Sequence, residues 1–220
     1  MESARFQPLT EVCYRQLTEG GRVLEADHHG TKLISLRDGR YLKLFRRKRM
    51  LSSALMRPYS RRFERNARRL AELGIPTVAP EALLRVPHLR RTAVLYRPLA
   101  GRTLRELLRA GDDERLIGAF GHFLGTLHGR GIYFRSLHFG NLVVTESGAF
   151  GLIDVADLDF RPAPLRAALV LRNLRHLMRY PEDWAQVWTA TQVFRMGYGE
   201  AGRPLPAAAE QLLARISLHQ

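Results

Sequence analysis

The stretch from Gly131 to Asp157 constrains the fold and function of this chain more than any other part of the sequence. It contains two short apolar runs, Leu142–Val144 and Gly151–Val155, which flank a turn-forming segment. This pattern predicts a β-hairpin. A polar loop ending in Asn141 precedes the first run, and Asp154 interrupts the second run. We therefore expect an amide and a carboxylate to lie side by side at one end of a hairpin.

Side-chain oxygens of this kind suit a magnesium ion. Mg²⁺ prefers hard oxygen ligands and is commonly held by one or two carboxylates together with the phosphates of a substrate. Asn141 and Asp154 are therefore predicted to be metal ligands.

The residues around the predicted hairpin resemble the catalytic and metal-binding loops of kinase-like phosphotransferases. Small bacterial members of this group read His-Gly-Asp-x-His-x-x-Asn, followed by a strand, a turn and Ile-Asp. The matching positions here are residues 134–141, followed by Ile153 and Asp154. The resemblance is to bacterial lipopolysaccharide core kinases (WaaP-type) and toluene tolerance proteins. This chain departs from the pattern at Phe134, in place of the first His, and at Ser136, in place of the proton-accepting Asp.

The resemblance implies an α+β, protein-kinase-like fold with two lobes. Residues 1–98 would form an N-lobe with a small antiparallel sheet and one helix, and residues 99–220 a mostly helical C-lobe. Local patterns agree with this division. Alternating runs at Arg22–Asp27, Thr31–Leu36 and Tyr41–Phe45, joined by turns, predict an antiparallel meander. An apolar stripe then predicts a helix over Ser60–Leu73.

The resemblance also implies ATP and Mg²⁺ as cofactors and assigns four residues to the nucleotide. Lys43 would bind its phosphates, Glu64 would pair with Lys43, and Tyr96 and Pro98 would lie where the chain passes between lobes and reads the adenine edge. The residues alone leave other interpretations open. Lys43 also fits a solvent-facing lysine on an amphipathic strand, and Glu64 fits a first-turn acid that interacts favourably with the helix dipole.

Ser136 and His138 are the predicted catalytic residues. A serine hydroxyl can orient an acceptor but has essentially no proton affinity at neutral pH, so His138 or Asp157 would have to take the proton. Three functions follow: an active kinase for a lipopolysaccharide-core sugar or related envelope acceptor, a pseudokinase that binds nucleotide and regulates or scaffolds envelope biogenesis, or a small atypical kinase associated with tRNA, as in the KEOPS complex.

The charge of the chain favours anionic partners. The sequence has 35 Lys and Arg residues against 21 Asp and Glu residues, giving a formal net charge of +14. Arginine matches phosphate and carboxylate geometry, so an anionic saccharide, a lipid headgroup and nucleic acid are all candidates. The basic segment 46–62, with interleaved apolar residues, is predicted to contact the inner face of the cytoplasmic membrane. A solvated helix face is the alternative.

The remaining features indicate an ordinary globular chain. The hydrophobic share of 45% is enough for a core, and no apolar run has the length of a membrane span. The N-terminal residues lack the succession of a signal peptide, so we expect a cytoplasmic product. Cys13 is predicted to be structural, and so are His122 and His128, whose spacing matches no metal-site pattern.

Overall fold

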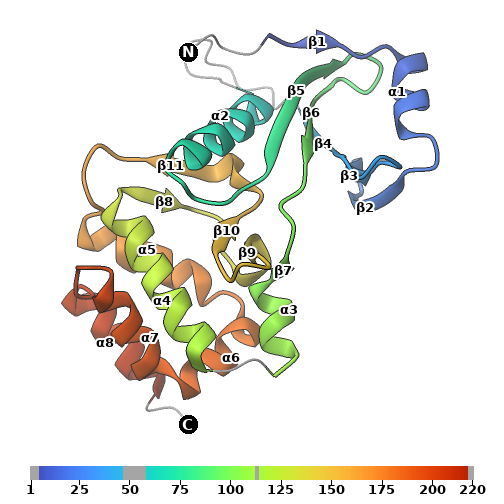
Figure 1. Ribbon diagram of the computed structural model, residues 1–220. Helices are drawn as coiled ribbons and strands as arrows, with labels where there is room; N and C mark the ends of the chain where they lie inside the picture. The colour runs from blue at the N-terminus through green and yellow to red at the C-terminus, as the bar shows by residue number, and fades with distance from the viewer. Residues whose placement is uncertain (1–4, 47–57, 112–113, 218–220) are drawn as a thin grey trace. The chain divides into compact units, whose positions relative to one another are not determined.

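The computed structural model describes residues 5–46, 58–111 and 114–217. The chain divides into two compact units. The N-terminal unit comprises Met1–Leu99 and Ile153–Ala156, and the C-terminal unit comprises Ala100–Leu152 and Asp157–Gln220. The first is built on a sheet and the second is mostly helical (Figure 1). The predicted α+β class is confirmed.

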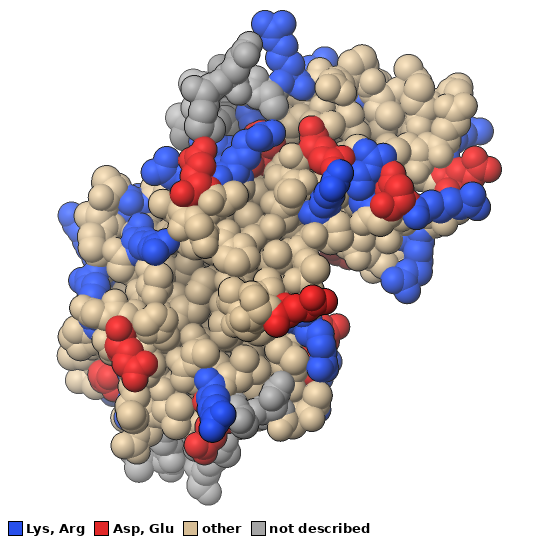
Figure 2. Space-filling view, viewed as in Figure 1, with Lys and Arg blue, Asp and Glu red and all other residues tan. Residues whose placement is uncertain are grey.

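The prediction of membrane contact falls largely on residues that the structure does not describe. Of the basic segment 46–62, residues 47–57 lie outside the described ranges. None of the helices in the described ranges is long and apolar enough to span a membrane. Figure 2 shows lysine and arginine side chains spread over the face in view, with acidic side chains among them.

A six-stranded sheet in the order β1-β5-β6-β4-β3-β2 forms the N-terminal unit. The neighbours are antiparallel except β1, which pairs in parallel with β5 and was not predicted. The predicted meander corresponds to β2, β3 and β4. The elements of this unit are β1 Gln7–Pro8, α1 Glu11–Thr18, β2 Arg22–Asp27, β3 Gly30–Ser35, β4 Tyr41–Arg46, α2 Tyr59–Glu72, β5 Ala79–Val86 and β6 Arg91–Arg97.

The two faces of this sheet are covered differently. Strand side chains alternate between faces, so Leu42 and Leu44 of β4 enter a buried apolar cluster against which residues of α1 pack. On the other face, Phe63 of α2 packs against Phe45 of β4, with ring centroids 5.8 Å apart. Lys43 has the same strand parity as Phe45, and the alternation therefore directs it towards the α2 face.

The C-terminal unit combines helices with two small sheets, of order β10-β9-β7 and β11-β8. The segment from Trp184 to Tyr198 is divided between two helices rather than forming one. Two helices, α6 and α7, meet at Ala190, whose φ of −120° and ψ of 28° break the helical geometry. The elements are β7 Arg102–Thr103, α3 Leu104–Arg109, α4 Glu114–Gly129, β8 Ile132–Phe134, β9 Leu142–Val144, β10 Phe150–Leu152, β11 Leu158–Phe160, α5 Ala167–Leu177, α6 Pro181–Thr189, α7 Thr191–Glu200 and α8 Ala207–Ser217.

Helices α4 and α7 pack backbone against backbone through glycines (Figure 1). A Cβ atom at Gly197 of α7 would lie 2.0 Å from the carbonyl oxygen of Gly118. A Cβ atom at Gly121 of α4 would lie 2.3 Å from the carbonyl oxygen of Phe194. Both contacts are with backbone atoms of the facing helix, which cannot move aside without moving that helix. The close packing of α4 and α7 therefore requires glycine at these positions.

Substitution of Gly197 by Ala is therefore expected to lower the free energy of unfolding by about 2 kcal/mol, because the added methyl forces the two helices apart. Gly199, on the same helix, is the matched control, since a Cβ there meets no atom within 4 Å. Gly199→Ala is expected to be neutral or stabilising by up to about 1 kcal/mol. Urea denaturation measures both variants. Equal stabilities would show that the crossing is not tightly packed.

Candidate functional site

The predicted strand lysine and hairpin acid form an ion pair in the N-terminal unit. Lys43 Nζ lies 2.9 Å from Asp154 Oδ1. The Lys43 side chain is 13% exposed and that of Asp154 is 45% exposed. The lysine side chain is therefore largely buried, while the Asp154 carboxylate remains accessible to a ligand.

Asp154 was predicted to lie within the second strand of the hairpin, and this is wrong. β10 ends at Leu152, and Asp154 follows it with a φ of +54°. This left-handed conformation cannot continue a β-ladder, although Asp adopts it more readily than most residues. Residues in such sparsely populated conformations are frequent at functional sites.

A side chain from α2 holds the segment that carries Asp154, and Tyr96 of β6 lies within range of the Asp154 charge. The buried Asn66 of α2 donates from Nδ2 to the carbonyl oxygen of Val155, at 2.8 Å. Burial is the main cause that raises the pKa of Tyr96, and the negative charge of Asp154 raises it further. The Tyr96 ring packs against Phe63 of α2. Asn66 was missed from the sequence, although an amide on the apolar stripe of an amphipathic helix was an available indication.

Glu64 does not pair with Lys43, contrary to the prediction. Its carboxylate pairs with the Arg68 guanidinium, and the i, i+4 spacing of a helix brings these two side chains together. Among the described residues, the ion-pair partner of Lys43 is Asp154. Glu64 is buried, and it lies beyond the first turn of α2. It is therefore not the first-turn acid of the alternative interpretation either. A role for Glu64 in binding nucleotide stays a prediction.

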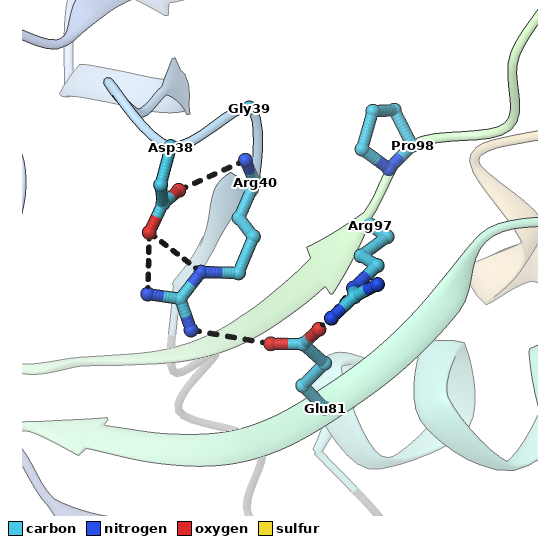
Figure 3. A pocket seen from close by; sticks show the side chains of 6 residues that line it. All are labelled: Asp38, Gly39, Arg40, Glu81, Arg97 and Pro98. Carbon is cyan, nitrogen blue, oxygen red and sulfur yellow. Dashed lines mark hydrogen bonds and ion pairs between the residues drawn. The ribbon is translucent and has the colours of Figure 1, made fainter.

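A cavity of about 550 Å³ lies where β6 ends and the chain reaches Pro98 (Figure 3). A chain of ion pairs lines it. Arg40 lies 2.6 Å from Asp38 and 3.2 Å from Glu81, and Arg97 lies 2.7 Å from Glu81. These charges compensate one another and tie the turn after β3 to β5 and β6. Pro98 therefore borders a cavity whose charged side chains are paired with one another. Its predicted contact with the adenine stays a prediction.

The loop between β8 and β9 carries Ser136, His138 and Asn141. Asn141 Nδ2 donates to the carbonyl oxygen of Ser136, at 3.1 Å, which closes the loop. Asn141 is buried and directs its amide hydrogens into the protein, so its Oδ1 is the atom suited to a metal ion.

His138 caps the short 3-10 turn Phe139–Asn141, because its Nδ1 accepts the backbone N–H of Gly140, at 3.1 Å. A neutral imidazole whose Nδ1 accepts a hydrogen bond carries its proton on Nε2. This arrangement favours a positioning role for His138 over the role of a proton acceptor.

A buried carboxylate on α6 anchors this loop. Asp183 receives two hydrogen bonds from Arg105 of α3, each 2.6 Å long, and a third from the backbone N–H of Phe139, at 3.3 Å. Asp183 is 4% exposed. Sequence reasoning missed it, since an acid in the first turn of a helix after Pro181 has a sufficient local explanation in the helix dipole.

A second buried network holds the start of the loop. Asn173 of α5 donates to the carbonyl oxygen of Phe134, at 2.8 Å, and its Oδ1 lies 2.9 Å from Nε2 of His128. The other ring nitrogen of His128 lies 2.8 Å from the Tyr198 hydroxyl. The amide oxygen can only accept, so Nε2 carries the proton and Nδ1 accepts from Tyr198. Burial raises the pKa of Tyr198 to about 12, which keeps it a donor.

The same network makes stability dependent on pH. Burial lowers the pKa of His128 to about 4, well below the ordinary value of about 6.5 for a histidine. Between these values the unfolded chain binds more protons, so stability is lost as pH falls from 6.5 towards 4, by up to about 3 kcal/mol. We expect urea denaturation between pH 7 and 4.5 to show this loss. His128→Gln should reduce the pH dependence, whereas His122→Gln, exposed on the same helix, should leave it unchanged.

The two predicted metal ligands both lie close in sequence to one residue pair of the β9–β10 hairpin. Leu142 of β9 pairs with Leu152 of β10, and Asn141 immediately precedes this pair while Asp154 closely follows it. One amide oxygen and one accessible carboxylate fit Mg²⁺ when phosphates and water complete the shell. Asn141 and Asp154 belong to different units, and their shared coordination of one ion stays a prediction.

No family model and no curated protein sequence matches the chain. Solved structures of WbdD, described as a bifunctional kinase-methyltransferase, are similar to it. One shares 16% identity and covers 84% of this chain and 47% of its own, with a TM-score of 0.49. A co-crystal structure of WbdD with a kinase inhibitor shares 18% identity over 86% and 48%, with a TM-score of 0.48. The chain thus spans about half the length of these structures.

Proposed function

We propose that this chain is an ATP-dependent phosphotransferase of the kinase-like type, which transfers the γ-phosphate of ATP to an alcohol group. The Lys43–Asp154 ion pair is the observation that carries the proposal. A mostly buried ammonium group suits phosphate oxygens, and an accessible carboxylate in a left-handed conformation suits a metal ion. In the absence of nucleotide the two charges neutralise each other.

Asp154 and Asn141 would hold the magnesium ion in this proposal. When bound, Mg²⁺ neutralises charge on the phosphates of ATP. The chain's own contribution is positional. Asn66 fixes the backbone at Val155, next to Asp154, and the hydrogen bond to Ser136 fixes the Asn141 amide.

Asp157 is the residue that we assign as proton acceptor in place of the missing aspartate. In the antiparallel β8–β11 pair, Phe134 faces Leu158. Arg135 and Asp157 are the next residues at that end of the pair, and Ser136 follows directly. Ser136 would orient the acceptor hydroxyl, whose proton passes to the half-buried Asp157 carboxylate as the acceptor oxygen bonds to the γ-phosphorus and ADP leaves.

The acceptor that we propose is a lipopolysaccharide-core sugar or a related envelope molecule with anionic groups. The resemblance to core kinases and the formal net charge of +14 support this choice. Contact of segment 46–62 with the inner membrane face belongs to the same proposal. Transfer RNA is the alternative polyanion, and binding that is weak at every salt concentration would dismiss it.

A nucleotide-binding pseudokinase is the second candidate. Ser136 lacks proton affinity, and Nδ1 of His138 is engaged by the backbone of Gly140. Neither residue of the loop is therefore suited to accept a proton from the acceptor. General-base catalysis commonly contributes about 10²- to 10⁴-fold to the rate, and a chain without it would transfer phosphate correspondingly slowly.

ATP turnover with Mg²⁺ and purified core oligosaccharide separates the two candidates. We expect slow turnover by the wild type and a fall of about 100-fold in Asp157→Asn. Ser136→Asp should raise turnover about tenfold or more and should make it insensitive to the Asp157→Asn change. Nucleotide binding without turnover in any variant would support the pseudokinase. Absence of both binding and turnover would refute the phosphotransferase proposal.

A further inference from the structure

Basic side chains gather beside the Ser136 loop in the C-terminal unit. Arg172 and His176 of α5 and Arg179, just beyond its end, have i, i+4 and i+7 spacing and therefore share one face of the helix. Arg135 leaves β8, which packs against α5. We call Arg135, Arg172, His176 and Arg179 the α5 basic cluster.

His176 lies at the centre of this cluster. Its Nε2 lies 3.3 Å from Arg179 Nη1, so Nε2 accepts and the neutral ring carries its proton on Nδ1. Nδ1 is buried and has no hydrogen-bond partner in the described part of the chain. Burial, and then the positive charges of Arg179, Arg135 and Arg172, lower the pKa of His176, whereas Asp157 opposes this shift. The three guanidinium groups are thus close enough to one imidazole to disfavour its protonation.

Ion pairing distinguishes the arginines of the cluster from other arginines of the C-terminal unit. Within the described ranges, Arg135, Arg172 and Arg179 take part in no ion pair, in contrast to Arg105 with Asp183 or Arg161 with Asp159. Like charges held together without a counter-ion repel one another, and a bound anion relieves that repulsion. Guanidinium groups match the oxygens of a phosphate in charge and geometry.

We infer that the α5 basic cluster binds a phosphate-type dianion carried by the acceptor, and so presents the acceptor hydroxyl to Ser136 and Asp157. This inference rests on the proposed function for the identity of the ligand as an acceptor. The anion site itself requires neither ATP nor turnover. Its chemistry is that of a phosphate monoester, with the three arginines contacting its oxygens.

Inorganic phosphate is the first probe. In the full chain, the His176 ring resonances should shift saturably on phosphate addition but not with sodium chloride at the same ionic strength. The double variant Arg172→Gln, Arg179→Gln should lose at least about tenfold in affinity, because two charge-assisted contacts are removed. Arg166→Gln, an exposed change at the opposite end of α5, is the matched control and should bind as the wild type does. Equal shifts with chloride, or unchanged affinity in the double variant, would overturn the site.

Glucose 6-phosphate is the second probe, because it carries the same group on a sugar. Affinity equal to or tighter than that of inorganic phosphate supports an acceptor site, whereas binding of inorganic phosphate alone overturns that assignment. The outcomes separate from those of the proposed function. Phosphate binding without ATP turnover contradicts the phosphotransferase alone, and turnover without phosphate binding contradicts the anion site alone.

Discussion

Replacing Lys43 by Met is expected to lower the rate of phosphoryl transfer by about 10²- to 10³-fold, because a preorganised positive charge at the phosphates is lost. The lysine is held on the α2 face of the sheet, and the Asp154 carboxylate keeps its ammonium group in place at 2.9 Å. Single-turnover measurement with saturating ATP separates this effect from a change in nucleotide affinity. An unchanged rate would show that Lys43 does not contact the reacting phosphate.

The same substitution should leave the fold almost unaffected. Asp154 is 45% exposed and stays hydrated without its partner, so we expect a change in unfolding free energy below about 1 kcal/mol. Arg85→Met on β5 is the matched control, because it removes an exposed cation from the same sheet. Its turnover should equal that of the wild type. A large loss of stability in Lys43→Met would assign the ion pair a structural role instead.

Replacing Asp183 by Ala is expected to lower the free energy of unfolding by about 3 kcal/mol. Removing one member of a buried ion pair leaves the other charge uncompensated. Here the Arg105 guanidinium, 25% exposed, loses both of its 2.6 Å hydrogen bonds, and the Phe139 N–H loses its acceptor. The loop that carries Ser136 should then become mobile, and turnover should fall together with stability.

A partly exposed ion pair of the same unit provides the comparison. Arg195 and Glu210 lie 2.8 Å apart and are 33% and 41% exposed. Glu210→Ala should cost less than about 1 kcal/mol, because the pair is partly exposed and Arg195 keeps its hydrogen bond to the carbonyl oxygen of residue 210. Urea denaturation of both variants, with hydrogen exchange at residues 136–141, measures the effect. Similar losses in the two variants would mean that Asp183 is not a special anchor.

Short-range patterns predicted much of the fold. The alternation around Lys43 predicted a strand with the lysine on the face opposite to the leucines, and the stripe containing Phe63 predicted α2 to within a residue or two at each end. The apolar runs after Asn141 predicted the β9–β10 hairpin. In each case the burial of one face dictates the period of the sequence, so the pattern is visible locally.

The polar contacts of the candidate site were not visible in this way. Asn66 and Val155 are 89 residues apart in sequence, and Arg105 and Asp183 are 78 residues apart. Such pairs form only once the elements pack. Of these residues, Asn66 alone departs from its local pattern, as an amide on the apolar stripe of α2. The predicted pairing of Lys43 with Glu64 was wrong because Glu64 pairs with Arg68, one helical turn away on α2.

The return of Ile153–Ala156 to the N-terminal unit has a consequence for dissection of the protein. The polypeptide crosses between the two units at residues 99–100, 152–153 and 156–157. A recombinant fragment ending at Leu99 would therefore lack Asp154 and the carbonyl group that satisfies Asn66. Separate expression of the halves leaves the N-terminal product without residues 153–156, and the C-terminal product carries these residues without the unit to which they belong. Truncation and domain-swap experiments should therefore keep the three crossings intact.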